Sequence, residues 1–493
     1  MSKGLDEQIS QLRKYKWVDL HGLVTCATLH LSNTESDGPR CVSISLLGKG
    51  SFNTAYKLVF SNDTEVAASI SCYDKDNFNP EAKRSEISTM SFVRESGLYP
   101  DVPVPKVLAF DLTFTNPACA PYVLMEVVPG VTVELEDNKP NDADATSKLH
   151  ARELALVKAL ANLQASLSKP VPFNKIGSIA TDTDGKYVVG PLMEMDQECW
   201  DGPFESIQDF WRLQLQEAML FALKEWVNIE TDSFPRDPED SCQPPCTPQL
   251  FAELFQLLSS LIPHFQPPKS CLPLVLHHPD IAFRNVLFDE TSVSSDNPKI
   301  TGVIDWGGAQ ILPLMFTARY PGDLMTELHS PFTRLGNPKE SWRTVPCDWT
   351  STGDISEWPE VWRRPGEPYD FGPRLRGKIR RFYLRTYFSA CCAEQLHALH
   401  GVVDLACATM FKDAPYYLKF HEVIRGGWKS WARHEMWIRE TYWRLRMSGH
   451  GNKGLEEVII GPNVYRESVE GPLCDLGITG EYSVPQENPA DQL

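Results

Sequence analysis

The chain has 493 residues, of which 42% are hydrophobic and 23% are charged, as in an ordinary globular protein that folds in water. Its 47 Lys and Arg against 65 Asp and Glu give a net charge of −18. This balance argues against nucleic-acid binding as the main task, because a phosphate backbone attracts basic surfaces. No run of about 18 apolar residues is present, so neither a membrane-spanning helix nor a membrane partner is expected.

Thirteen cysteines are spread from Cys26 to Cys474, and the first residues, MSKGLDEQIS, lack the apolar core of a signal peptide. We interpret the cysteines as reduced thiols inside the cell and expect a cytoplasmic location. Asp6 and Glu7 argue only weakly against a mitochondrial presequence, so a mitochondrial location stays open.

The first part of the chain predicts a small sheet with helices. Residues 1–35 start with apolar residues at helical spacing and continue as a mixed, strand-like segment. Residues 41–73 alternate as three strands, joined by a glycine-containing loop and by the turn Ser-Asn-Asp-Thr at 61–64. After them we expect a helix at 81–97, a strand entered at 102–108 and a strand at 122–128 that ends in Pro-Gly.

The rest of the chain predicts mainly helices. Apolar residues at threes and fours indicate helices at 141–168, 204–228 and 247–265. A long loop rich in Pro, Trp and Gly is expected at 333–372. Three helices follow it, at 374–400, 402–412 and 414–447, and the chain loses its periodicity from about residue 450.

The stretch that carries the chemistry is 275–310, VLHHPDIAFRNVLFDETSVSSDNPKITGVIDWGGAQ. It places two carboxylates, Asp280 and Asp305, and one carboxamide, Asn285, on short loops beside β-branched strands. Phosphoryl transfer from a nucleotide needs such a set. One carboxylate accepts the proton of a hydroxyl, while the other and an amide oxygen hold Mg²⁺ against the phosphates.

The stretch also resembles a known family. HPDIAFRNVLFD and ITGVIDWGGA match the forms HxDxxxxNVLxD and ITGVIDWxxA. The chain is therefore similar to the aminoglycoside phosphotransferase and choline kinase-like family, and most closely to its fungal phosphotransferase enzyme family proteins. The resemblance implies that Asp280 orients the acceptor hydroxyl, that Asn285 and Asp305 hold Mg²⁺, and that His278 braces the loop.

The resemblance further implies a nucleotide site in the first part of the chain. The glycine loop and the strand after it would approach the phosphates, and a hinge strand would receive the adenine edge. The residues concerned are Gly48, Lys49, Gly50, Ser51, Asn53 and Ala55 for the loop, and Glu126 and Val127 for the hinge.

One position departs from the family pattern. Ser69 stands in Val-Ala-Ala-Ser where the family has a basic residue that grips the phosphates, and a serine supplies no charge. Lys57, on the same strand face as Asn53, and Lys49 in the glycine loop are the two candidate replacements. Glu86, the family's helix glutamate, would then turn to solvent, to Lys57 or toward a metal ion.

The resemblance implies an α+β, bilobal, protein-kinase-like fold. Residues 1–129 would form the N-lobe around a small antiparallel sheet, and residues 130–493 would form a large, mainly helical C-lobe. The expected function is an ATP- and Mg²⁺-dependent small-molecule kinase whose partners are a nucleotide and a small acceptor. Two alternatives stay open: a nucleotide-binding module or pseudokinase without turnover, because of Ser69, and a fold adapted to acyl or nucleotidyl transfer.

Overall fold

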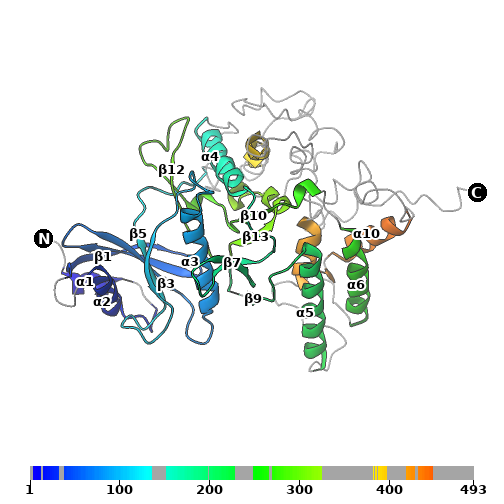
Figure 1. Cartoon of the computed structure of the whole chain (residues 1–493), viewed down its shortest axis with the longest axis horizontal. Coiled ribbons are helices and arrows are strands. Elements are labelled where there is room, and N and C mark those ends of the chain that lie inside the picture. The colour runs from blue at the N-terminus through cyan, green and yellow to red at the C-terminus, as the bar shows by residue number, and fades with distance from the viewer. Residues whose placement is uncertain are drawn as a thin grey trace, which may run out of the picture.

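The computed structural model describes residues 4–12, 15–32, 38–135, 151–197, 199–227, 248–265 and 269–324, and shorter segments within 381–396 and 418–447. Across the view of Figure 1 the described chain runs from a β-sheet at one end to a group of helices at the other. These helices are α5 (Ile207–Val227), α6 (Pro248–Leu261) and α10 (Glu435–Met447). No helix of the described part combines the length and the apolar character needed to cross a membrane.

The sheet has five strands with antiparallel neighbours, as the sequence predicts. Their spatial order is β1 (Cys41–Lys49), β2 (Asn53–Phe60), β3 (Glu65–Ser71), β5 (Tyr122–Glu126) and β4 (Val107–Asp111). Side chains alternate along β2, so that Tyr56 and Leu58 are buried on one face and Asn53 lies on the other. An antiparallel sheet combined with helices confirms the α+β class.

One face of the sheet is covered by α1 (Leu5–Gln11) and α2 (Leu20–Leu31), whose apolar side chains form one core with those of the sheet. The prediction of a strand-like segment before residue 35 is therefore wrong. Asp19 begins α2 by accepting the His21 N–H at 2.9 Å. The hydroxyls of Thr25 and Thr28 donate hydrogen bonds to the backbone carbonyls four residues earlier in the helix.

The opposite face is covered by α3 (Pro80–Glu95), where Ile87 packs with Val123 of β5. Asn79 begins this helix, since its side chain accepts the Glu81 N–H at 3.0 Å. The Asn79 N–H in turn donates to Gln197 Oε1 at 2.8 Å. The first turn of α3 is thus tied to the segment that precedes β9 (Cys199–Trp200).

Beyond residue 150 the helices share a second and larger core. It includes α4 (Ala151–Leu167), α5 and α6, with the buried Trp211 donating to His421 Nδ1 at 3.0 Å. Three short hairpins accompany them: β6 (Ser178–Thr181) with β7 (Tyr187–Gly190), β8 (Leu192–Met193) with β9, and β11 (Val286–Phe288) with β12 (Ile300–Val303). A fourth pair is β10 (Leu274–His277) with β13 (Gln310–Pro313), and the remaining short turns are η2 (Ile262–His264), η3 (Lys269–Cys271), η5 (Leu314–Ala318) and η6 (Gly322–Leu324).

Most predicted elements appear with shifted ends. One exception is the helix predicted at 414–447, which is interrupted where Gly427 adopts φ +60°, a backbone conformation that favours glycine. Residues 141–150, the loop at 333–372, the helix at 402–412 and the tail from 450 lie outside the described residues.

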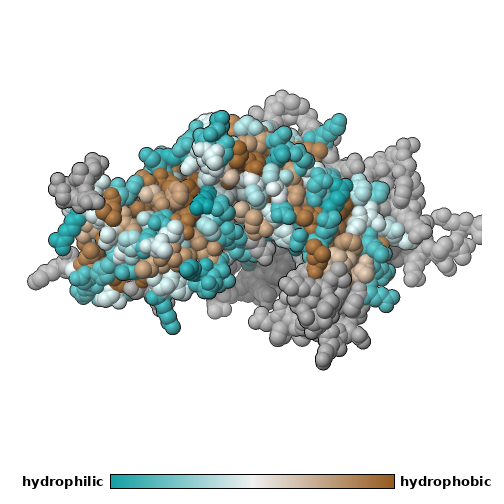
Figure 2. All heavy atoms as spheres, turned by 60° about the horizontal axis from the view of Figure 1, so that its bottom comes forward, coloured by the Kyte–Doolittle hydropathy of each residue, from teal (hydrophilic) through white to brown (hydrophobic). Residues whose placement is uncertain are grey.

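The edge strand β1 leaves three apolar side chains exposed, Val42, Leu46 and Leu47. Figure 2 shows one face of the molecule, on which apolar and hydrophilic residues are interleaved. Exposed apolar residues of this kind are common on globular proteins and do not by themselves mark a binding surface.

Gly130 makes the close junction after the fifth strand. The following residue, Val131, exchanges two 2.9 Å backbone hydrogen bonds with Phe288 of β11. Gly130 has φ +140°, and a Cβ there would meet Thr301 Oγ1 and lie 2.8 Å from the Phe288 carbonyl oxygen. Only glycine therefore suits this position.

We expect Gly130→Ala to lower the free energy of unfolding by about 3 kcal/mol or more, because backbone strain and a steric clash add together. Gly185→Ala is the matched control. Gly185 also has a positive φ, +77°, but nothing lies within 4 Å of an added Cβ, so about 1 kcal/mol is expected. Urea unfolding measures both, and equal losses would contradict the close junction.

Candidate active site

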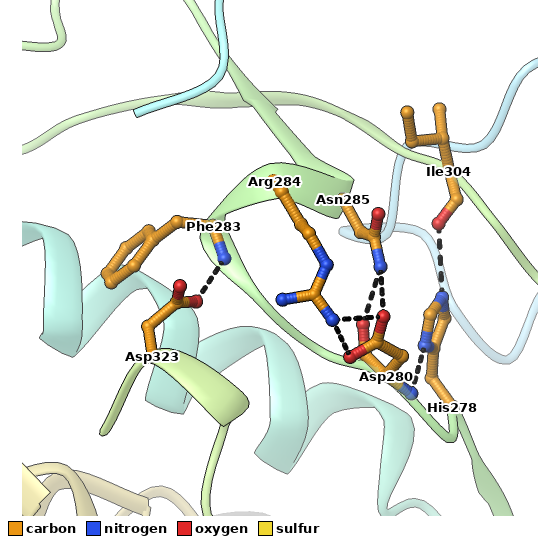
Figure 3. Close-up of polar contacts among 7 residues, drawn as sticks. All are labelled: His278, Asp280, Phe283, Arg284, Asn285, Ile304 and Asp323. Atoms are coloured by element: carbon orange, nitrogen blue, oxygen red, sulfur yellow. Dashed lines mark hydrogen bonds and ion pairs between the residues drawn. The ribbon is translucent and has the colours of Figure 1, made fainter. Parts of the chain in front are cut away.

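The loop that contains Asp280 is fixed by strands at both ends. It leaves β10 after His277, makes the turn η4 (Phe283–Asn285) and enters β11. Asp323 Oδ2 accepts the Phe283 N–H at 2.7 Å and holds the turn from outside (Figure 3). The predicted loop between two strands is thus present, and the Asp323 side chain holds its turn.

His278 connects this loop to the strand that carries Asp305. Its Nδ1 accepts the Asp280 N–H, and its Nε2 lies against the Ile304 carbonyl oxygen, both at 3.2 Å (Figure 3). Since a carbonyl can only accept, the proton is on Nε2 and the ring is neutral. Burial lowers the pKa of His278 to about 4, which keeps the ring neutral near pH 7. The ring thus joins the loop of Asp280 to the segment of Ile304.

Asp280 is held by its two neighbours on the loop. Arg284 Nη2 lies 2.6 Å from both carboxylate oxygens, and Asn285 Nδ2 donates to Asp280 Oδ2 at 2.8 Å (Figure 3). Because Asn285 directs its amide nitrogen to Asp280, its amide oxygen points away from that residue. The Asp280 carboxylate is thus held in one orientation, and the Asn285 amide oxygen stays available as a ligand for a cation.

Asp305 follows β12. Beyond the last paired residues of β11 and β12, one more backbone hydrogen bond joins the two segments. The Ile304 N–H donates to the Asn285 carbonyl at 3.0 Å, so Asp305 and Asn285 leave the two strands at the same end. The chain turns sharply here, since Asp305 has φ +64°. Burial, followed by the negative charges of Glu86 and Asp280, raises the pKa of Asp305 to about 6.

Glu86 points to the same place from α3. A Cβ built on Gly307 would lie 3.6 Å from Glu86 Oε2 and 4.0 Å from Asp305 Oδ1, so the two carboxylates flank one glycine. The partner of Glu86 is Lys83, whose Nζ lies 2.6 Å from Glu86 Oε2 and 3.0 Å from Asn53 Oδ1. Lys83 is a buried lysine with 5% of its side chain exposed.

Two pockets adjoin these groups. One pocket is lined by Lys83, Glu86 and Asp305. Its lining also includes Asn53, Glu194, Met195, Gln197 and the two glycines after Trp306. The other is lined by Asp280 together with Gln164, Arg319 and Tyr320. Asp280 and Asp305 thus each line a different pocket, and the Asp280 charge acts on Asp305 between them.

The two lysines predicted as replacements for a strand lysine do not line the first pocket. Lys57 forms an ion pair with Glu65 at 2.6 Å on the same sheet face. It lies four residues beyond Asn53, a rise of about 13 Å along a strand. Lys49 has its Nζ 5.6 Å from the centroid of the Tyr15 ring. Ser69 lies in the middle of the sheet, paired with Ala55 and Val123.

The segments predicted as the glycine loop and the hinge use several of their backbone groups within the fold. Gly50 donates its N–H to the Asn53 carbonyl at 2.8 Å, and the Ser51 carbonyl accepts from Cys72 Sγ. A Cβ on Gly48 would meet nothing within 4 Å. At the hinge, the Glu126 N–H is used by the Lys106 carbonyl at 2.9 Å, and its side chain pairs with Arg94 at 3.0 Å. Glu126 therefore offers no N–H to an adenine here, and of the two predicted hinge residues Val127 remains as the candidate donor.

Three residues of the site were missed by sequence reasoning: Lys83, Arg284 and Glu194. Lys83 lies three positions before Glu86, which is the spacing of neighbours on one helix face, and this signal could have found it. Glu194 is buried beside the first pocket and pairs with Arg425. No short sequence pattern links two residues so far apart in the chain.

A model of the phosphotransferase enzyme family matches residues 73–316, about half of the chain. A subtelomeric hrmA-associated cluster protein of Aspergillus fumigatus is 25% identical over 326 residues, which cover 57% of this chain and 60% of that protein. Altered inheritance of mitochondria protein 9, mitochondrial, of Kluyveromyces lactis is 28% identical over 224 residues, which cover 43% of this chain and 34% of that protein. The chain thus spans less than two thirds of the length of these curated relatives.

Solved structures are also similar at low identity. Amicoumacin kinase hAmiN in complex with AMP-PNP, Ca²⁺ and Ami aligns with 92% of this chain and 93% of its own at 11% identity, with a TM-score of 0.38. The GDP complex of aminoglycoside 2′-phosphotransferase-IIIa aligns with 91% of this chain and 98% of its own at 13% identity, with a TM-score of 0.36.

The match of residues 73–316, which include Glu86, Asp280, Asn285 and Asp305, places this chain in the phosphotransferase enzyme family.

Proposed function

We propose that the protein is an ATP- and Mg²⁺-dependent kinase that transfers the γ-phosphate to a hydroxyl of a small metabolite. The observation that carries the proposal is the placement of Asp280, Asn285 and Asp305 at one end of the β11 and β12 pair. Asn285 contacts Asp280 directly and lies one backbone hydrogen bond from the residue before Asp305. Family membership of residues 73–316 supports the same reaction class.

The residues at Asp305 fit a magnesium ion. Asp305 and the amide oxygen of Asn285 are hard oxygen donors, which Mg²⁺ prefers. The raised pKa of Asp305 reflects burial and uncompensated negative charge, which a divalent cation would offset. When bound, the ion would neutralise charge on the phosphates. The protein would supply the two ligands and a site partly shielded from water.

In the proposed reaction Asp280 acts on the acceptor. The acceptor hydroxyl gives its proton to the Asp280 carboxylate while its oxygen forms a bond to the γ-phosphorus. The bond between that phosphorus and the bridging oxygen breaks, and ADP leaves with the electron pair. The side chain of Arg284, which covers Asp280, is 61% exposed, so the guanidinium has room to turn toward solvent when an acceptor binds.

The proposed architecture is bilobal, with residues 1–129 as the N-lobe and 130–493 as the C-lobe. Two observations support it: the sheet has an apolar core of its own with α1 and α2, and Gly130 makes the tight junction that follows. The acceptor would enter the pocket of Asp280, Gln164 and Tyr320, which has both polar and apolar walls. A cytoplasmic location is retained, with the mitochondrion as the alternative, and cell fractionation separates the two.

A nucleotide-binding module without turnover remains the second candidate function, because Ser69 removes the strand cation. Incubation of the protein with ATP·Mg²⁺ and a metabolite mixture, followed by a search for products heavier by one phosphoryl group, distinguishes the two. A phosphorylated product and released ADP support the kinase. Nucleotide binding with neither product nor phosphate release would favour the module.

We expect Asp280→Asn to lower the rate of phosphate transfer or ATP hydrolysis by about 10²- to 10⁴-fold, because the amide cannot accept the hydroxyl proton. Affinity for ATP·Mg²⁺ should stay within about threefold, since Asp280 is assigned to the acceptor and a factor of that size is under 1 kcal/mol. Phosphate release and calorimetry measure the two quantities. Asp184→Asn, in the exposed turn between β6 and β7, is the control, and an unchanged rate in Asp280→Asn would refute the role.

We expect Asp305→Asn to be more stable than the wild type at pH 7.5 without metal, by up to about 3 kcal/mol. The folded-state pKa of Asp305, about 6, exceeds the ordinary value of 3.8. Protonation of Asp305 therefore favours the fold below pH 3.8, and this contribution is lost as pH rises through 6. Urea unfolding in EDTA should show the gap at pH 7.5 and no gap near pH 4.

Asp289→Asn is the matched control with the opposite sign. Hydrogen bonds from Thr291 and Ser292 lower the pKa of Asp289, so its ionised form stabilises the fold at neutral pH. This variant should be less stable than the wild type at pH 7.5. A decrease in stability at pH 7.5 for Asp305→Asn as well would contradict the uncompensated charge at Asp305.

A further inference from the structure

We propose that Lys83, on helix α3, binds the phosphates of the nucleotide and replaces the cation that Ser69 does not provide. The inference rests on the proposed function and adds a phosphate-binding residue that the sequence pattern does not assign. Its basis is the position of the Lys83 ammonium group between the start of β2, Glu86 and Asp305.

The first argument is position. Lys83 Nζ lies 3.0 Å from Oδ1 of Asn53, the first residue of β2 after the glycine loop. The Gly50 N–H donates to the Asn53 carbonyl at 2.8 Å, which holds the loop beside this point. A phosphate chain that runs from the glycine loop toward Asp305 would therefore pass the ammonium group.

The second argument is donor capacity. An ammonium group has three N–H donors and no acceptor. Asn53 Oδ1 and Glu86 Oε2 account for two of them. The third N–H can donate to a phosphate oxygen. The N–H that now donates to the neutral Asn53 amide can also turn to a phosphate, because a hydrogen bond between two charged groups is stronger.

The third argument is charge. Among the described residues that line this pocket, Lys83 is the single cationic side chain, whereas Glu86, Asp305 and Glu194 are acidic. Arg425 compensates Glu194 from outside the lining. Lys83 therefore balances one of the two other carboxylates. Among the described lining residues, it is the cation that a nucleotide with its metal ion would meet.

The fourth argument is the fixed position of the helix. Lys83 lies in the first turns of α3, and the residue that begins α3, Asn79, makes two hydrogen bonds to Gln197, at 2.8 Å and 3.0 Å. Side chains three apart lie on one helix face, so Lys83 and Glu86 enter the pocket together. The charge is presented by the helix, and the sheet need not contribute a basic residue.

The test compares two ligands that differ in phosphate alone. We expect Lys83→Met to weaken ADP·Mg²⁺ binding by about 10- to 100-fold, the effect of one or two charge-assisted hydrogen bonds. Adenosine binding should change by less than about twofold, since adenosine carries no phosphate and that factor is near 0.4 kcal/mol. Isothermal calorimetry on the full chain measures both. Lys175→Met, which removes another ion-paired lysine, is the control and should leave both affinities unchanged.

A second variant covers the case in which Lys83→Met does not fold because Glu86 is left buried without its partner. Lys83→Met with Glu86→Gln removes both charges and leaves no unpaired carboxylate at that point. The same loss of ADP·Mg²⁺ affinity with unchanged adenosine affinity is expected. Lys57→Met tests the other candidate lysine. If only this variant loses ADP·Mg²⁺ affinity, and the Lys83 variants do not, Lys57 binds the phosphates instead.

The outcomes separate the two proposals. A wild-type protein that binds neither ADP·Mg²⁺ nor ATP·Mg²⁺ refutes the proposed function itself. A wild type that binds, together with Lys83 variants that bind equally well, overturns the Lys83 assignment alone. Equal losses for adenosine and ADP·Mg²⁺ would assign Lys83 a purely structural role and would also overturn it.

Discussion

The backbone of Ile304 is held from two sides, and the geometry of the site depends on this constraint. Its N–H donates to the Asn285 carbonyl, and its carbonyl accepts from His278 Nε2. The first bond extends the ladder of β11 and β12, and the second reaches across from the loop of Asp280. Because a neutral imidazole is rigid and buried, it fixes the separation of loop and strand better than a flexible side chain would. The two bonds therefore tie the loop of Asp280 and Asn285 to the segment that carries Asp305.

The same arrangement makes the site electrostatically costly. Glu86 and Asp305 flank Gly307, and burial raises the pKa of Asp305 to about 6. Protein interiors rarely keep carboxylates so close without a compensating cation, and sites of function are where such arrangements are maintained. The Lys83 ammonium group relieves part of this repulsion. If the proposed metal-bound nucleotide enters this site, its cation would relieve the rest, and binding would then stabilise the folded chain.

Sequence patterns predicted those candidate residues whose signal comes from neighbours along the chain. Asp280 and Asn285 share one loop, Asp305 ends a recognisable strand, and Glu86 lies on a helix with clear apolar spacing. Lys83 was missed although its spacing to Glu86 was a signal, because EAKRSE carries charges on several sides of the helix. The packing of α3 on the sheet shows which side enters the pocket. Lys57 was a candidate because its face was correctly predicted, but its partner Glu65 belongs to the next strand. α2 was mistaken for a strand because β-branched residues outweighed the capping residue Asp19 in the pattern.

The ion pair between Lys83 and Glu86 lies within one helix. In protein kinases the corresponding pair joins a strand lysine to a helix glutamate, so it forms only when the helix is docked, and displacing the helix switches the enzyme off. Here both partners lie on α3, so their ion pair can form whether or not the helix is docked on the sheet. Control by helix displacement would instead have to act on the contacts at its first turn, Asn53 with Lys83 and Gln197 with Asn79. In this chain the neutralisation of Glu86 therefore does not depend on the docking of α3. A strand lysine would couple the two.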